Sequence, residues 1–180
     1  YKRQDGCNTR NFYTIFFSAD DTSSDAALGN FDNYKILVDT LHLIVTRQNV
    51  LHKTKYKVLI RYHPRSSQEL CNTISKEYRN TDGVAIDMTL NNQEVLDRSI
   101  VSVCFGSTMA FESMIQKVPT AFVNLNDVFT SLYGIFDLSQ VPYVVNASGL
   151  QSFIKHPYIK ANFMNLHKHA ISNVVKFISL

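Results

Sequence analysis

Several features are scarce in this 180-residue chain, and each absence excludes a class of protein. No apolar run approaches the roughly 20 residues that a membrane-spanning helix needs, and residues 1–5 lack the pattern of a signal peptide. The three cysteines share no metal-ligand spacing, and an odd number of them gives no closed disulfide framework. This cysteine usage favours a reducing compartment, so we expect a cytoplasmic protein.

Charge of one sign is also scarce. Lysine and arginine number 18 against 15 acidic residues, which gives a formal net charge of +3. This charge permits an anionic ligand, but no clustered basic stripe accompanies it, so we expect no nucleic-acid partner. Hydrophobic residues make up 45% of the chain, and no repeat or linker interrupts it. We therefore expect one domain over residues 1–180, and the missing initial methionine predicts a piece of a longer protein.

Apolar, β-branched runs alternate with amphipathic segments along the chain. Strands are predicted at residues 11–18, 57–62, 84–86, 99–105, 120–125 and 141–145. Helices are predicted at 31–52, 67–79, 91–98, 148–155 and 158–180, with another that opens near residue 107 and stops before Pro119. The apolar face of the first helix is expected to contain Ile36, Leu37, Leu41, Ile44, Val45 and Leu51. This alternation predicts an α/β, Rossmann-like fold, a parallel sheet with helices on both faces.

The most informative stretch begins at the predicted strand 99–105. Gly106 ends that strand, and Ser107 and Thr108 stand where a helix would begin. Such a turn makes an anion site, because free backbone N–H groups, two hydroxyls and the positive end of the helix dipole converge there. Glu112 lies one turn further on, within reach of a ribose hydroxyl if a nucleotide phosphate occupies the turn. The plainer interpretation is that the hydroxyl residues only cap the helix.

A second polar segment follows the predicted strand 57–62. Pro64 fixes the turn and leaves His63 at the strand tip, where an imidazole can hydrogen-bond a base, a ribose or a phosphate. Arg61 and Arg65 flank the histidine, and guanidinium groups suit phosphate oxygens. The alternative is a histidine whose hydrogen bonds are satisfied within the turn. Both polar segments follow strands, where open α/β sheets bind ligands, so the sequence predicts a phosphate-bearing ligand.

The loop expected at residues 19–30 is crowded with acidic and hydroxyl side chains. Its plainest interpretation is a solvated loop with helix caps, and the alternative is a loop that contributes ligand contacts at a strand end. The Asp20-Asp21 pair lacks a third ligand at a settled spacing, so the sequence predicts no metal site.

In this order, the segments resemble the C-terminal, donor-binding lobe of GT-B glycosyltransferases, especially capsule, lipopolysaccharide and teichoic-acid transferases. Residues 58–64 resemble the strand and His-Pro motif of bacterial sialyltransferases, Kdo transferases and glycerophosphotransferases. Residues 105–112 resemble their second motif, a Ser/Thr pair that opens a helix with a downstream glutamate. Residues 117–122 resemble the step that follows, with Gln116 in place of the usual glycine, and residues 17–21 are similar to the loop that opens the donor lobe.

The resemblance implies a nucleotide-sugar donor, with a hint of a cytidine nucleotide, and transfer to a saccharide or lipid-linked acceptor without metal or other cofactor. The expected nucleotide- and phosphate-binding residues are Ser18, Arg61, His63, Pro64, Arg65, Gly106, Ser107, Thr108 and Glu112. Of these, His63 is expected at the nucleotide or its phosphate and Glu112 at the ribose. The general base of this family usually belongs to an N-terminal lobe that this chain lacks. We therefore name no catalytic residue, and expect a cytoplasmic domain, peripheral to the inner membrane face, that binds donor with little turnover.

Two alternatives stay open. A sugar-nucleotide epimerase of the 2-epimerase type shares the fold and similar phosphate sites. A degenerate, non-catalytic lobe that acts as an interaction module is the second, favoured by Gln116 and by the aromatic segment 126–140.

Overall fold

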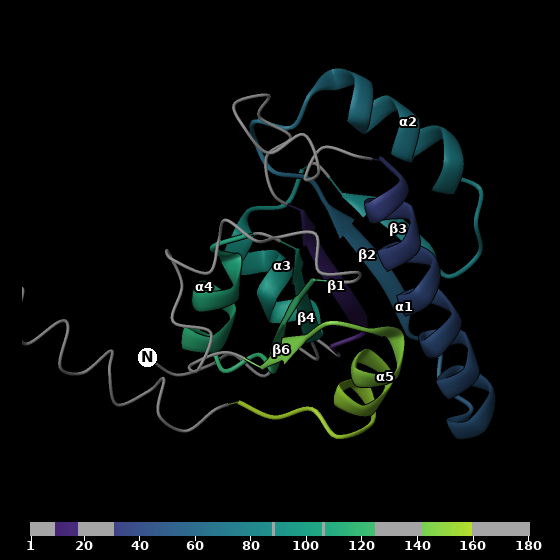
Figure 1. Cartoon of the computed structure of the whole chain (residues 1–180), viewed down its shortest axis with the longest axis vertical. Coiled ribbons are helices and arrows are strands. Elements are labelled where there is room, and N and C mark those ends of the chain that lie inside the picture. Colours follow the sequence, from purple (N-terminus) through teal and green to yellow (C-terminus); the bar gives the residue numbers. More distant parts are fainter. Residues whose placement is uncertain (1–9, 18–30, 88, 106, 125–141, 160–180) are drawn as a thin grey trace, which may run out of the picture.

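The structure is a computed structural model that describes residues 10–17, 31–87, 89–105, 107–124 and 142–159. In chain order, its elements are β1 (Phe12–Phe17), α1 (Phe31–His52), β2 (Lys57–Arg61), α2 (Gln68–Tyr78), β3 (Val84–Asp87), α3 (Asn92–Arg98), β4 (Ser99–Phe105), α4 (Met109–Ile115), β5 (Thr120–Val123), β6 (Tyr143–Val144) and α5 (Ala147–Lys155) (Figure 1).

The described strands form one six-stranded sheet with the order β3-β2-β1-β4-β5-β6, and every neighbouring pair is parallel. The order reverses direction between β1 and β4, which makes this the switch point of a doubly wound sheet. The carboxyl ends of β1, β2 and β4 therefore open at one edge, where such sheets bind ligands. The predicted α/β, Rossmann-like parallel sheet is confirmed.

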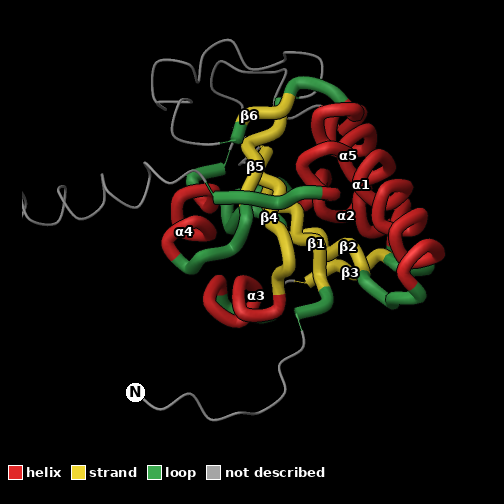
Figure 2. The backbone as a smooth tube through the Cα atoms, turned by 90° about the horizontal axis from the view of Figure 1, so that it is seen from below, coloured by secondary structure: helices red, strands yellow, loops and turns green. Residues whose placement is uncertain are grey.

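The sheet is buried on both faces. Helices α1, α2 and α5 cover one face, and α3 and α4 cover the other (Figure 2). Side chains alternate between these layers along each strand: Ile15 and Phe17 pack under α1, whereas Phe16 packs toward α4. Because both faces of the central strands are covered, these strands are near-continuous apolar runs, which is why they could be recognised in the sequence, whereas the edge strand β3 is only half-buried.

Helix α1 has the predicted bounds, but its buried face differs from the prediction. The buried side chains are Tyr34, Leu37, Val38, Leu41, Ile44 and Val45. Ile36 and Leu51, both predicted on this face, are exposed. A helix turns by about 100° per residue, so Ile36 points away from the arc that Leu37 and Leu41 define. Leu51 lies in the last turn of the helix.

Side-chain caps fix the starts of three helices. Ser67 accepts a hydrogen bond from the backbone N–H of Leu70, and Asn146 accepts one from Gly149. Asn91 and Glu94 form a reciprocal capping box at α3. The predicted strand 141–145 is shorter than expected, with only Tyr143–Val144 paired. Residues 158 and 159 are not helical, and the remainder of the predicted helix 158–180 lies outside the described residues.

Candidate functional site

A pocket of about 180 Å³ lies at the carboxyl ends of β1 and β2 and beside the start of α4. Of the predicted site residues, those that line it are Arg61, His63, Pro64, Ser107, Thr108 and Glu112. Arg65 is exposed and does not belong to the lining, and Ser18 and Gly106 lie outside the described residues. The fold thus brings the two predicted polar segments together at the switch point of the sheet.

His63 is held in one orientation by its own turn. The backbone N–H of Arg65 donates to Nδ1 of the imidazole over 3.1 Å. A ring nitrogen that accepts a hydrogen bond carries no proton, so the neutral ring has its proton on Nε2. Burial, and then the positive charge of Arg65, hold the pKa of His63 below its usual 6.5. At neutral pH the imidazole is therefore uncharged, with Nε2–H as its donor.

Arg61 lines the pocket, but its charge is already paired. Its Nη1 donates to Oδ2 of Asp87 over 2.9 Å, and both side chains are largely buried. Burial raises the pKa of Asp87, but hydrogen bonds from Thr89 and Leu90, together with the charge of Arg61, outweigh this and lower it. Asp87 is thus an ionised partner, which the sequence analysis did not identify. A phosphate in the pocket has to share the guanidinium with this carboxylate.

The two hydroxyl residues at the start of α4, Ser107 and Thr108, have different roles. Ser107 is buried, and its Oγ accepts a hydrogen bond from the backbone N–H of Met109 over 3.3 Å. The capping interpretation therefore describes Ser107, whose hydroxyl stabilises the turn. Thr108 is exposed at the pocket, and its hydroxyl makes no capping hydrogen bond. Helix α4 has only seven residues, so its dipole is short, and Thr108 and Glu112 are polar side chains that line the pocket on this side.

Five residues that line the pocket were not predicted as site residues: Phe16, Phe17, Tyr62, Asn92 and Met109. Asn92, the first residue of α3, donates from Nδ2 to Sδ of Met109 over 3.3 Å, and both side chains line the pocket. Asn92 lies within the helix predicted at 91–98, and no motif in the sequence marks it as a site residue. Its place at the pocket depends on how α3 packs beside α4 on the same face of the sheet.

The missing glycine at Gln116 does not strain the chain. Gln116 has φ −77°, a backbone conformation open to any residue. The left-handed conformation of this turn is instead adopted by Lys117, with φ +59°. Gln116 therefore gives no structural support to the view that the lobe is degenerate.

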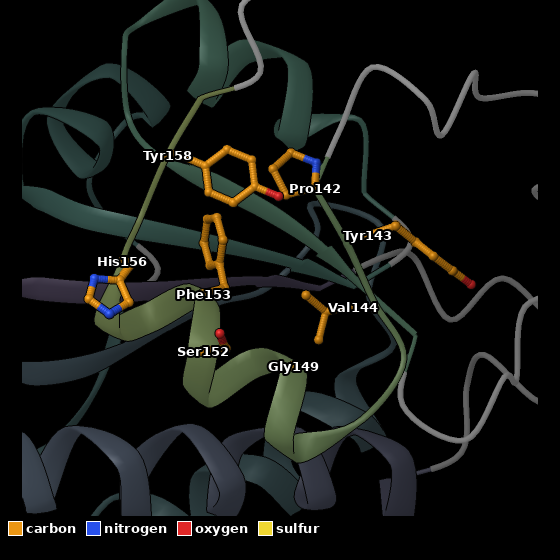
Figure 3. Close-up of a pocket in the computed structure, with 8 residues that line it drawn as sticks. All are labelled: Pro142, Tyr143, Val144, Gly149, Ser152, Phe153, His156 and Tyr158. Atoms are coloured by element: carbon orange, nitrogen blue, oxygen red, sulfur yellow. The ribbon is translucent and has the colours of Figure 1, made fainter.

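A second hollow, of about 340 Å³, lies beside the edge strand β6 and helix α5. Phe153 and Tyr158 meet edge to face there with ring centroids 5.6 Å apart, whereas Tyr143 points away from them (Figure 3). The Tyr143 hydroxyl accepts a hydrogen bond from Asn124. Neither lysine nor arginine is among the described residues that line this hollow. It has none of the predicted phosphate-binding residues.

No family model matches the chain, and no curated protein is significantly similar to it. Within the described ranges, no group of three or more His, Cys, Asp or Glu side chains could hold a metal ion, and no helix is long and apolar enough to cross a membrane. The polar groups that line the pocket include the ring N–H of His63, the hydroxyl of Thr108 and the carboxylate of Glu112. These groups can bind an anion and a neighbouring hydroxyl.

Proposed function

We propose that this chain binds a nucleotide-activated sugar, as the donor lobe of a GT-B-type glycosyltransferase in surface polysaccharide biosynthesis. One observation carries the proposal: His63, at the end of β2, and Thr108, after β4, line a single pocket at the switch point of the sheet. Ligands of doubly wound sheets bind at such a crevice. Glu112 adds an acceptor on the same wall.

In this proposal the pocket holds the phosphates of the donor. Nε2–H of His63 and the hydroxyl of Thr108 donate to phosphate oxygens, and Glu112 accepts from a ribose hydroxyl. The pocket of about 180 Å³ is below the roughly 300–1,000 Å³ of a typical small-molecule site. It suits a phosphate or pyrophosphate group, so the sugar and the base extend outside it.

The chemical role of the lobe is to stabilise the leaving group. During transfer the bond between the sugar carbon and the phosphate oxygen breaks, and its electron pair stays on that oxygen. His63, which its own turn holds in place, stabilises the developing charge with little reorganisation, and Thr108 supplies a second donor. The acceptor hydroxyl forms the new bond and loses its proton to a base on the N-terminal lobe. We therefore expect the isolated chain to bind donor and to turn over little or none.

Calorimetric titration of the full chain with CMP, CDP, UDP and GDP tests this proposal. A hydrogen bond to a charged group contributes about 1.5–3 kcal/mol, so His63→Ala and Thr108→Ala should each weaken binding about tenfold or more. His52→Ala and Thr73→Ala are matched controls, because both residues are exposed and neither lines the pocket. Unchanged affinity in the two pocket variants would place the ligand elsewhere.

One observation favours the interaction module as a second candidate. Arg61, the arginine that lines the pocket, is already neutralised by Asp87, so the pocket has less positive character than the sequence suggests. A degenerate lobe that no longer binds a nucleotide sugar does not need a free arginine, so the Arg61–Asp87 ion pair would not impair it. Four flat titrations would favour the module, whereas a measurable affinity for one of the nucleotides would favour the donor lobe.

A further inference from the structure

Four large aliphatic side chains of α1 are exposed, namely Ile36, Leu43, Val50 and Leu51, and the first three share one spacing. Ile36, Leu43 and Val50 are 41%, 51% and 76% exposed. They recur every seven residues, so they form one stripe that extends for about 21 Å along the outer side of the helix. Helix α1 runs along one side of the molecule (Figure 1). Single exposed aliphatic residues are ordinary, but three at seven-residue spacing lie on one face of a helix, where they can meet a second helix.

The stripe and its flanks are symmetric about Leu43. Ile36 and Val50 lie seven residues before and after it, and Asp39 and Arg47 lie four residues before and after it. If a second α1 lies antiparallel to the first, with a two-fold axis at Leu43, then Ile36 of one copy meets Val50 of the other. The same axis places Asp39 of each copy level with Arg47 of the other. The helix is therefore complementary to itself in both shape and charge.

The two charged side chains are placed for such a contact. Arg47 is exposed. About half of the Asp39 side chain is exposed, and the hydroxyl of Tyr78 holds its carboxylate with a hydrogen bond of 2.7 Å. Lys35 also pairs with Asp39, at 3.4 Å, so Arg47 of a second copy would join an existing pair. An exposed ion pair adds little affinity, but it selects the antiparallel orientation over the parallel one.

We propose that the outer stripe of α1 is the contact face of a symmetric, antiparallel homodimer of this chain. A shallow groove lined by His42, Thr46 and Val50 lies beside this stripe. None of the stripe residues lines the candidate pocket, so the dimer leaves it open. One helix face buries less than the roughly 800 Å² per partner of a standard interface, so the association is weak and concentration-dependent.

Sedimentation equilibrium of the full chain, from about 5 µM to about 1 mM, tests the dimer. The expected result is a monomer–dimer equilibrium that Leu43→Glu abolishes, because two carboxylates would then meet on the axis. Ile115→Glu, on α4, introduces the same charge at a similarly exposed aliphatic residue and should leave the association unchanged. A monomer at every concentration, or a dimer that persists in Leu43→Glu, would overturn the proposal.

Charge reversal tests the antiparallel register. Arg47→Asp and Asp39→Arg each place like charges in both symmetric contacts of a homodimer, so each should dimerise several-fold more weakly than the wild type. Mixing the two variants restores both contacts, and a heterodimer should form about as readily as the wild-type dimer. Failure of the mixed pair to associate would exclude this register.

A cysteine variant gives a readout that does not depend on these charges, which matters because Asp39→Arg also removes the bonds to Tyr78 and Lys35. Leu43 meets its own copy on the two-fold axis, so Leu43→Cys should form a disulfide-linked dimer on mild oxidation. Ile115→Cys is the matched control and should stay monomeric. Equal cross-linking of the two variants would contradict the proposed contact.

Discussion

Arg61 and Asp87 occupy matching register positions on the parallel strands β2 and β3, and an ion pair of 2.9 Å joins them beside the candidate pocket. The pair connects the turn that begins at His63 to the segment that leads into α3. Asp87 also accepts hydrogen bonds from the backbone N–H and hydroxyl of Thr89, at 3.0 and 2.9 Å. One carboxylate thus connects the end of β2 to the turn that leads into α3.

Asp87→Asn should lower the free energy of unfolding by about 1.5–3 kcal/mol, because it removes the charge but keeps an acceptor for Thr89. Asp87→Ala should cost more, since the N–H groups of Thr89 and Leu90 then lose their acceptor. Urea denaturation at pH 7 measures both values. Asp97→Asn is the matched control, because Asp97 is exposed on α3. Equal midpoints for Asp87→Asn and the wild type would show that the ion pair does not stabilise the fold.

His63 should titrate below pH 6.5 in the folded chain, because burial and the charge of Arg65 lower its pKa. Protonation of Nδ1 also removes the acceptor of the Arg65 N–H. Proton NMR measures the midpoint, with the resonance assigned from His63→Asn. In Arg65→Gln the positive charge is gone, so the midpoint should rise. A wild-type midpoint above 6.5 would contradict the pocket geometry.

The same pKa shift has a consequence for stability. The folded chain binds fewer protons at His63 than the unfolded chain does, so this contribution is complete above about pH 6.5. It is lost as the pH falls through the folded-state pKa. On acidification, the free energy of unfolding should therefore fall more in the wild type than in His63→Asn.

Ser107 and Thr108 should separate stability from binding. Ser107→Ala removes the hydroxyl that accepts from Met109 N–H, so it should lower the free energy of unfolding by about 0.5–1.5 kcal/mol. Thr108→Ala should leave stability nearly unchanged, because that hydroxyl makes no capping bond. Thermal denaturation and nucleotide titration of the two variants, each the control for the other, measure the two effects. If Thr108→Ala lowered stability and Ser107→Ala lowered only nucleotide affinity, the two residues would have the opposite roles.

Lys117→Gly should stabilise the chain. A side chain in the left-handed region costs about 1–2 kcal/mol, partly offset by the greater freedom of glycine when unfolded. With Lys117 at φ +59°, a net gain of about 0.5–1 kcal/mol is expected in urea denaturation. Gln116→Gly is the control and should destabilise, because Gln116 has an ordinary φ of −77°. If Gln116→Gly instead raised the free energy of unfolding, the left-handed residue of this turn would be Gln116 and not Lys117.

Much of the architecture follows from local sequence patterns. Continuous apolar runs mark strands that are buried on both faces, and the spacing within residues 31–52 marks α1 with its observed bounds. Such patterns need only neighbouring residues, which is why they can be recognised without the fold. The surface of α1 shows the limit: Ile36 fits an apolar spacing, yet only the packing of α1 on the sheet determines that it points outward.

The sequence by itself determined the alternation of strands and helices, and the placement of His63 and Thr108 after two strands. Only the tertiary structure decided that these strands flank β1, so that the two side chains share one pocket. It also decided that Arg61 is paired, that Ser107 caps its own turn and that Asn92 reaches the site. The physical reason is the sequence separation of the interactions. The periodicity of helices and strands is set by residues a few positions apart. Strand order and side-chain pairing depend on contacts between distant segments.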